Sequence, residues 1–148
     1  MTVIFSKKCE LALQAVLYLS VNKDKNFFSA SGISEQIKMP KEFIAKILQS
    51  LVSHGIVVSK KGKTGGFNIN KPLNEIRLID IVAAVDGLEI FHKCVLGFEG
   101  CNVEQPCPLH NKWGKLRDMT YNMLSEETLL DILDKTEEKI KSINPANI

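Results

Sequence analysis

The stretch PKEFIAKILQSLVSHGIVVSKKGKTGGFNI, residues 40–69, joins a helical pattern directly to a hairpin pattern. Apolar residues recur at helical spacing from Phe43 to Leu51, and Gly55 is placed to end that helix. Two short runs with strand character follow, 56–59 and 66–69, and a tip rich in lysine and glycine separates them. The stretch therefore predicts a helix followed at once by a β-hairpin.

Two shorter helical segments precede this stretch. Residues 9–21 are dense in apolar side chains, and residues 30–38 follow Ser29, a residue type that favours the N-cap of a helix. Met39 and Pro40 break the second segment from the third helix, because proline is tolerated only in a first helical turn. Three helices followed by a hairpin predict a mainly α fold with a small β-hairpin wing, the winged helix-turn-helix.

The charge of the chain is unevenly distributed along its length. Residues 1–71 contain eleven lysines, no arginine and four acidic residues, a net charge of +7, whereas residues 72–148 carry a net charge of −5. A helix with a polar outer face and a lysine-rich hairpin tip suit the major groove and the phosphates of double-stranded DNA. The candidate DNA-binding residues are Lys41, Glu42, Ala45, Lys46, Gln49, Ser50, Lys60, Lys61, Lys63, Thr64 and Gly65. Chance clustering of solvated lysines around an ordinary turn is the alternative.

The composition excludes several other classes of protein. With 45% hydrophobic and 24% charged residues in 148 positions, the chain has the composition of an ordinary globular domain. No run approaches the roughly 18 apolar residues of a membrane span, and the N-terminus lacks the order of a signal peptide. We therefore expect a cytoplasmic protein with reduced cysteines and no membrane partner. The three histidines have no evident catalytic company, so no enzyme is predicted.

The second half of the chain predicts helices around a long irregular segment. Residues 77–86 form a short helical pattern, residues 88–111 show no periodicity, and a further helix begins near Trp113. Ser125 is the expected N-cap of a last helix, whose narrow apolar stripe to Ile143 is typical of packing on a partner helix. We expect a DNA-binding domain at 1–72, and a sensor loop (88–111) with a helical dimerisation region at 73–148.

The irregular segment contains a cluster of possible metal ligands. Cys94, Cys101, Cys107 and His110 lie within 17 residues, and such a cluster in the cytosol favours a metal or cofactor site. Zinc usually requires a tight Cys-x2-Cys pair, which is missing, whereas iron–sulfur clusters tolerate looser spacing. Three free cysteines in a surface loop are the alternative. Cys9 stands apart in the first helix and is expected to be a small core residue.

Several of these motifs, taken in order, resemble the Rrf2 family, the IscR/NsrR-type winged-helix repressors of bacteria. The matching runs are Glu10–Leu13, Gly55–Val57, Gly62–Phe67, Glu75–Val82, Asp86–Gly87, Cys94, Cys101, Cys107–His110 and Trp113. The resemblance implies a homodimer whose long C-terminal helix crosses to the partner. It also implies an iron–sulfur cluster on the three cysteines whose state controls DNA affinity. The fourth ligand implied is His110, which we favour slightly, or Glu10 of the partner subunit.

The chain departs from the family pattern at three places. Six residues separate Cys94 from Cys101 where the family commonly has five, so the cluster type, [2Fe–2S] or [4Fe–4S], stays open. Lys61 stands where the family usually has arginine, which removes bidentate readout of guanine. Arg77 replaces the usual threonine cap, so Asp80 alone must satisfy the start of that helix.

The sequence thus predicts a DNA-binding transcription regulator, expected to be a repressor, that senses through a cysteine-ligated iron–sulfur cluster. One alternative is a regulator of the same fold without a cluster, which responds through cysteine redox chemistry or to a protein or small-molecule effector. Another is a thiol oxidoreductase, but such an enzyme ordinarily needs a Cys-x2-Cys pair that the chain lacks.

Overall fold

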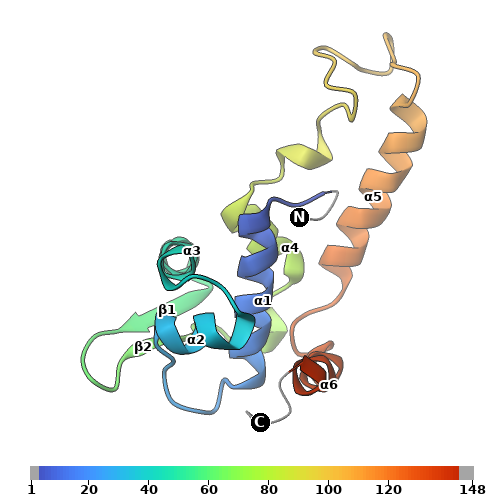
Figure 1. Ribbon diagram of the computed structural model, residues 1–148. Coiled ribbons are helices and arrows are strands. Elements are labelled where there is room, and N and C mark those ends of the chain that lie inside the picture. Colours follow the sequence, from blue (N-terminus) through green and yellow to red (C-terminus); the bar gives the residue numbers. More distant parts are fainter. Residues whose placement is uncertain (1–3, 144–148) are drawn as a thin grey trace.

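The computed structural model describes residues 4–143, which form six α-helices and one antiparallel hairpin (Figure 1). The order of three helices followed by a hairpin confirms the predicted winged helix-turn-helix. The elements are α1 (Lys7–Val21), α2 (Ala30–Ile37), α3 (Lys41–Ser53), β1 (Val57–Lys60), β2 (Gly66–Ile69), α4 (Leu78–Val85), α5 (His110–Glu126) and α6 (Leu133–Ile143). Short 3₁₀ turns, η1 (Leu73–Glu75) and η2 (Glu89–Phe91), precede and follow α4.

Local signals in the sequence set the ends of the first three helices. The Ser6 hydroxyl accepts a hydrogen bond from the Cys9 amide at 3.0 Å, and Ser29 caps α2 in the same way. Helix α3 begins directly after Pro40. It ends before Gly55, whose φ of 73° is a conformation that glycine adopts without strain.

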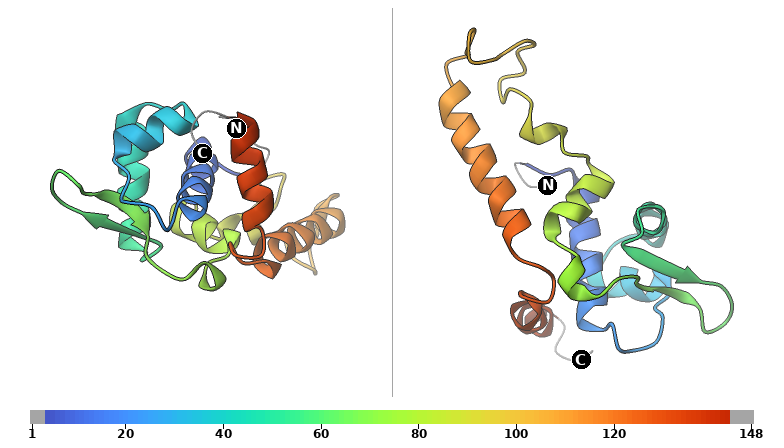
Figure 2. Two further views of the ribbon diagram at one scale, coloured as in Figure 1. Left: turned by 90° about the horizontal axis from the view of Figure 1, so that it is seen from below. Right: turned by 180° about the vertical axis from the view of Figure 1, so that it is seen from behind.

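The hairpin is anchored to the body of the molecule by a backbone pair with the segment before α2. Val57 pairs with Ile69 in the register of the two strands, and Phe28 forms an isolated antiparallel bridge with Phe67. The Phe67 amide donates to the Phe28 carbonyl at 2.8 Å, and the Phe28 amide donates back at 3.0 Å. The base of the wing is therefore held from two sides, while its tip extends away from the helices (Figure 2).

Helix α1 lies at the centre of the main hydrophobic core. Its residues Leu11, Val16 and Leu19 are almost completely buried. The core also contains residues from α2, α3, the hairpin and the segments around α4: Ile33, Ile44, Ile47, Leu48, Leu51, Ile56, Val57, Ile69, Ile76, Ile81 and Leu129. Because α1 contacts elements from both halves of the chain, α2, α3 and the C-terminal region share one core.

A second, smaller core joins the beginning of α1 to α4, η2 and the end of α5. It consists of Cys9, Ile79, Val82, Phe91 and Leu124, all buried. Cys9 has no exposed surface, which confirms its expected place in the core.

The start of α4 follows the prediction for its first turn. The Arg77 amide donates to the Asp80 carboxylate at 2.8 Å. Asp80 therefore makes the half of a capping box that pairs with the N-cap amide. The Asp80 amide, which a threonine side chain would have accepted, donates instead to the Arg77 carbonyl at 3.0 Å.

The last two helices differ from the sequence prediction. Ser125 does not cap a new helix: it lies in the last turn of α5, and its hydroxyl donates to the Tyr121 carbonyl at 2.6 Å. Helix α5 ends because the following backbone pairs elsewhere, with Leu129 N–H donating to the Ile76 carbonyl at 2.8 Å. Asp131 then accepts hydrogen bonds from the amide and hydroxyl of Thr128, and α6 begins at Leu133.

The apolar stripe of the C-terminal segment was expected to face a partner helix, and this expectation was wrong for its buried members. Leu129 and Thr136 are buried within their own chain, and α6 packs on α1. The long helix that stands apart is α5, on which Leu116, Met119 and Met123 are more than half exposed (Figure 1). Among residues 4–143, no helix combines the length and apolar character needed to cross a membrane.

Gly66→Ala should destabilise the wing. Gly66 has a φ of 137°, and a Cβ there would overlap the Phe28 carbonyl that accepts the hydrogen bond anchoring the hairpin. We expect a loss of at least about 2 kcal/mol in the free energy of unfolding, measured by urea denaturation. Gly114→Ala in α5 is the matched control, because its nearest neighbour would lie at an ordinary 3.6 Å. Equal stability of the two variants would contradict the anchoring contact.

Candidate functional site

The loop between η2 and α5 brings three cysteine side chains together. The sulfurs of Cys94, Cys101 and Cys107 all lie within 4.8 Å of one another, with 3.5 Å between those of Cys94 and Cys107. His110, at the beginning of α5, places Nδ1 3.2 Å from the Cys101 sulfur. All four side chains are half-buried. The structure thus assembles at one point the four residues that the sequence suggested as a ligand set.

Tight turns fold the loop back so that the sulfurs converge. Gly97 and Gly100 have φ values of 78° and 70°, a conformation that other residues rarely adopt. The side-chain oxygen of Asn102 accepts hydrogen bonds from the backbone amides of Glu104 and Gln105. The two arms of the loop are tied by Trp113, whose indole N–H donates to the Lys93 carbonyl at 2.9 Å.

Backbone amide groups are directed at the sulfurs. Burial opposes ionisation of Cys94, but hydrogen bonds from the amides of Phe98 and Leu96 prevail and lower the pKa of its thiol. Burial and the neighbouring cysteines instead raise the pKa of Cys107, despite a hydrogen bond from the Leu109 amide. The Cys107 amide itself donates to the Cys101 sulfur at 3.4 Å. Such N–H donors stabilise thiolates and, in metalloproteins, tune the metal centre that the thiolates hold.

A half-buried arginine completes the lining of this site. Arg117 of α5 lines the same small cavity as His92, the three cysteines, His110 and Trp113. Its Nε is buried without a hydrogen-bond partner among the described residues. A buried guanidinium N–H without an acceptor is costly, so an anionic group bound in this cavity would supply what this atom lacks. Three thiolates, an imidazole and an unpaired cationic donor fit a thiolate-held iron–sulfur cluster.

His92 and Arg117 did not emerge from the sequence prediction. A signal for Arg117 was present, because His110, Trp113 and Arg117 are spaced by three and four residues and therefore share one face of a helix. No comparable signal existed for His92, because it follows a 3₁₀ turn and reaches the cavity only through the fold of the loop.

Glu10, the alternative fourth ligand, lies on α1 and is not among the residues lining the thiol cavity. Its carboxylate is 3.2 Å from Lys7 Nζ. Partial burial works against ionisation, but the hydrogen bond and charge of Lys7 prevail and lower the pKa of Glu10. Within one chain, His110 is therefore the candidate that meets the thiols, and the role of Glu10 of the partner subunit stays a prediction.

The candidate DNA-binding residues lie on α3 and the wing. On α3, Lys41, Glu42, Lys46 and Gln49 are exposed, whereas Ala45 and Ser50 are half-buried. At the wing tip, Lys60, Lys61, Lys63 and Thr64 are exposed and Gly65 is half-buried. The ammonium group of Lys60 lies over the Phe27 ring, 5.7 Å from its centroid. Glu42 is the single acid in this set, so the surface as a whole is cationic.

A helix-turn-helix followed by a basic hairpin defines the class of winged-helix DNA-binding proteins. A family model described as Rrf2, iron-dependent transcriptional regulator, matches residues 5–135. The chain belongs to the Rrf2 family of transcription regulators.

Named relatives agree with this assignment. The chain is 30% identical over 139 residues to a putative HTH-type transcriptional regulator of Aquifex aeolicus, covering 93% of this chain and 96% of that protein. It is 26% identical over 132 residues to the HTH-type transcriptional regulator IscR of Pectobacterium carotovorum, covering 89% of this chain and 80% of that protein. These relatives are named as regulators and not as enzymes.

Solved structures share the fold. CymR of B. subtilis, described as the global cysteine regulator, superimposes with a TM-score of 0.74 at 20% identity, covering 90% of this chain and 98% of CymR. IscR of T. potens superimposes with a TM-score of 0.70 at 22% identity, covering 91% of this chain and 89% of that IscR chain. These likenesses support the fold of the whole described chain.

Lys61→Ala and Lys63→Ala should weaken binding to any DNA sequence. Each lysine that contacts a phosphate releases counterions on binding, so its loss should lower the slope of log K against log salt by about 0.9. Fluorescence anisotropy with a labelled duplex at several salt concentrations measures both quantities. Lys115→Ala, exposed on α5, is the control and should change neither. Unchanged affinity and slope in both wing variants would show that the wing does not contact DNA.

Cys9 should be inert towards alkylation while the loop cysteines react. Burial, with the charge of Asp86 adding to it, raises the pKa of Cys9 to about 12. At pH 8 only about one molecule in ten thousand then carries the thiolate that attacks iodoacetamide. Mass spectrometry of chelator-treated native protein should find Cys9 unmodified and Cys94 alkylated, whereas in guanidinium all four cysteines should react. Labelling of Cys9 in the native protein at the rate of Cys94 would contradict its burial.

Proposed function

We propose that this chain is a cytoplasmic, homodimeric repressor whose affinity for a DNA operator is controlled by an iron–sulfur cluster. Cys94, Cys101 and Cys107 would hold the cluster, and His110 would be the fourth ligand. The observation that carries the proposal is the convergence of three thiols beside the unpartnered, buried Nε of Arg117. A cluster bound through thiolates is an anionic group, which is what this atom lacks.

Each residue of the site would have a separate role in binding such a group. The three cysteines would bind as thiolates, and the amides directed at Cys94 and Cys101 would offset their negative charge. Arg117 Nε would donate a hydrogen bond to the anionic centre, and Trp113 would keep the two arms of the loop together. When bound, the cluster supplies sensitivity to iron supply, oxidants or nitric oxide. Both [2Fe–2S] and [4Fe–4S] remain compatible with this ligand set.

The loop is connected to the DNA-binding helices through the second core. Phe91, three residues before Cys94, is buried there with Cys9 and Val82, and its ring meets Tyr121 of α5 edge-on at 5.3 Å. Helix α4, which carries Val82, packs against both α1 and α3. Ordering or releasing the loop would therefore shift α4 and α5 relative to α3. In a dimer this shift would alter the spacing of the two recognition helices and their fit to the operator half-sites.

The long helix α5 suits the dimer contact in this proposal. Leu116, Met119 and Met123 form an apolar face on α5, and each is more than half exposed. A second copy of α5 would bury this face. In this arrangement residues 1–72 form the DNA-binding domain, and residues 73–148 form the sensor and dimerisation region.

One observation favours a second candidate, a regulator of the same fold that senses oxidants through its cysteines. The sulfurs of Cys94 and Cys107 are already 3.5 Å apart, so a modest movement would allow a disulfide between them. Such a bond would also change the order of the loop, with no metal involved. The two candidates differ in iron content, so one preparation separates them.

Anaerobic purification should yield coloured protein with iron and acid-labile sulfide in stoichiometric amounts. Cys94→Ser, Cys101→Ser and Cys107→Ser should each lose most of both, because a thiolate ligand is missing. Cys9→Ala is the matched control and should retain them, since Cys9 lies in the core. Operator binding by holo and apo protein should differ at least fivefold in fluorescence anisotropy.

The fourth ligand can be separated in the same assay. His110→Ala should lower iron retention, whereas Glu10→Ala should leave it unchanged. The reverse result would assign the role to Glu10. A colourless protein without iron or sulfide, prepared without air, would reject the cluster and favour the cysteine redox candidate.

A further inference from the structure

A second cavity lies between α1, α2 and α6. Its volume is about 600 Å³, within the usual range for small-molecule sites. None of its lining residues belongs to the cysteine site, and none is a candidate DNA contact. The cluster and DNA contacts proposed above therefore do not account for this cavity.

The walls of this groove are apolar and its polar groups include cations but no acid. The apolar wall is formed by Leu17, Ile37, Ile132, Ile140 and Ile143, beside the buried ring of Tyr18. Among residues 4–143, three lysines line it as well, Lys38 from α2 and Lys135 and Lys139 from α6, and no carboxylate does. An apolar cavity with positive charge on two sides is complementary to an apolar molecule with an anionic head.

The lysine contributed by α2 is held in an unfavourable backbone conformation. Lys38 has a φ of 56° and is the single residue other than glycine with a positive φ in residues 4–143. It follows the last turn of α2, a position that glycine or asparagine usually occupies. A lysine here is strained compared with glycine, and such strain is commonly found at binding sites. Its side chain gives the α2 wall of the groove a charge that glycine would not.

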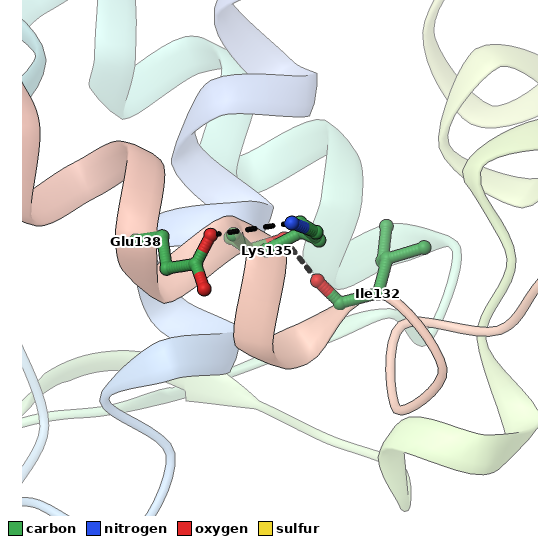
Figure 3. Close-up of polar contacts among 4 residues, drawn as sticks. Ile132, Lys135 and Glu138 are labelled. Carbon is green, nitrogen blue, oxygen red and sulfur yellow. Dashed lines mark hydrogen bonds and ion pairs between the residues drawn. The ribbon is translucent and has the colours of Figure 1, made fainter.

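The lysines of α6 are accessible to a ligand. Lys135 Nζ is 3.5 Å from Glu138, and 87% of the Lys135 side chain is exposed (Figure 3). An ion pair this open to solvent is weak, so the ammonium group can turn to a stronger acceptor. Lys139 lies one turn further along the same helix and is also exposed.

We propose that this groove binds a small amphipathic carboxylate, with its apolar body against Leu17, Ile37 and Ile140. The carboxylate would lie among Lys38, Lys135 and Lys139. A small molecule is favoured over a polypeptide because the cavity, about 600 Å³, has the volume of a small-molecule site and lysines line it from both α2 and α6.

Binding at this site would influence DNA recognition. The groove bridges α2, which packs against the recognition helix α3, and α6, which packs on α1. A ligand held by both walls would fix α2 relative to the C-terminal region and bias the position of α3. The operator affinity of the full-length protein should therefore change severalfold with the ligand, in addition to any effect of the cluster.

Calorimetric titration of the purified dimer with dodecanoate, below its micelle concentration, tests the proposal. We expect one dodecanoate per chain, and at least tenfold weaker binding of dodecan-1-ol, which has the same chain without the charge. Lys38→Gly should lower dodecanoate affinity at least fivefold while the melting temperature stays equal or rises, because glycine relieves the backbone strain. Lys139→Glu should reduce affinity further, and Lys115→Glu on α5 should not.

The following results would overturn the proposal. They are the absence of saturable dodecanoate binding, equal affinity for the alcohol, or an unchanged affinity in both Lys38→Gly and Lys139→Glu. Analytical ultracentrifugation of Lys139→Glu tests whether a second copy of the chain occupies the groove instead. Loss of the dimer in this variant would show that it does. Because the dodecanoate titration does not depend on iron content, its failure would leave the cluster proposal intact.

Discussion

Burial of α1 inside the molecule is the constraint on which the rest of the structure depends. One part of its surface packs with α2, α3 and the hairpin, and another packs with α4 and α6. Its beginning enters the second core through Cys9, close to Phe91 and the start of the cysteine loop. Because tightly packed cores transmit displacements instead of absorbing them, a change at the loop has a physical route to α3, the proposed recognition helix.

The cysteine site is held together by different interactions from those of the core. The loop that forms it buries few apolar groups, and Val95, Leu96, Phe98 and Val103 are exposed. Its order depends on turns at glycine, on the Asn102 side chain and on the hydrogen bond of Trp113. A segment held by so few contacts responds readily to whatever binds its sulfurs. Few contacts suit the proposed sensor role of the loop, whereas equally few contacts around α1 would leave the protein unstable.

Sequence reasoning located most elements because their ends depend on local interactions. Ser29, Pro40 and Gly55 set helix ends through groups at most a few residues away, and the structure agrees at each. The prediction that Ser125 caps the last helix was wrong. Backbone pairing between Leu129 and Ile76, which are far apart in sequence, outweighed the local preference of serine for an N-cap. The apolar stripe of α6 was recognised, but periodicity does not reveal which surface covers it, and that surface is α1 of the same chain.

The sequence by itself determined the helix-turn-helix and wing, the cationic character of the first half, and the set of Cys94, Cys101, Cys107 and His110. These features depend on residue type and on spacing along the chain. The tertiary structure alone decided that His92 lines the cavity of the thiols and that α1, α2 and α6 enclose a lysine-lined groove. Such features join residues far apart in sequence, and their positions follow from packing around α1, which no local pattern encodes.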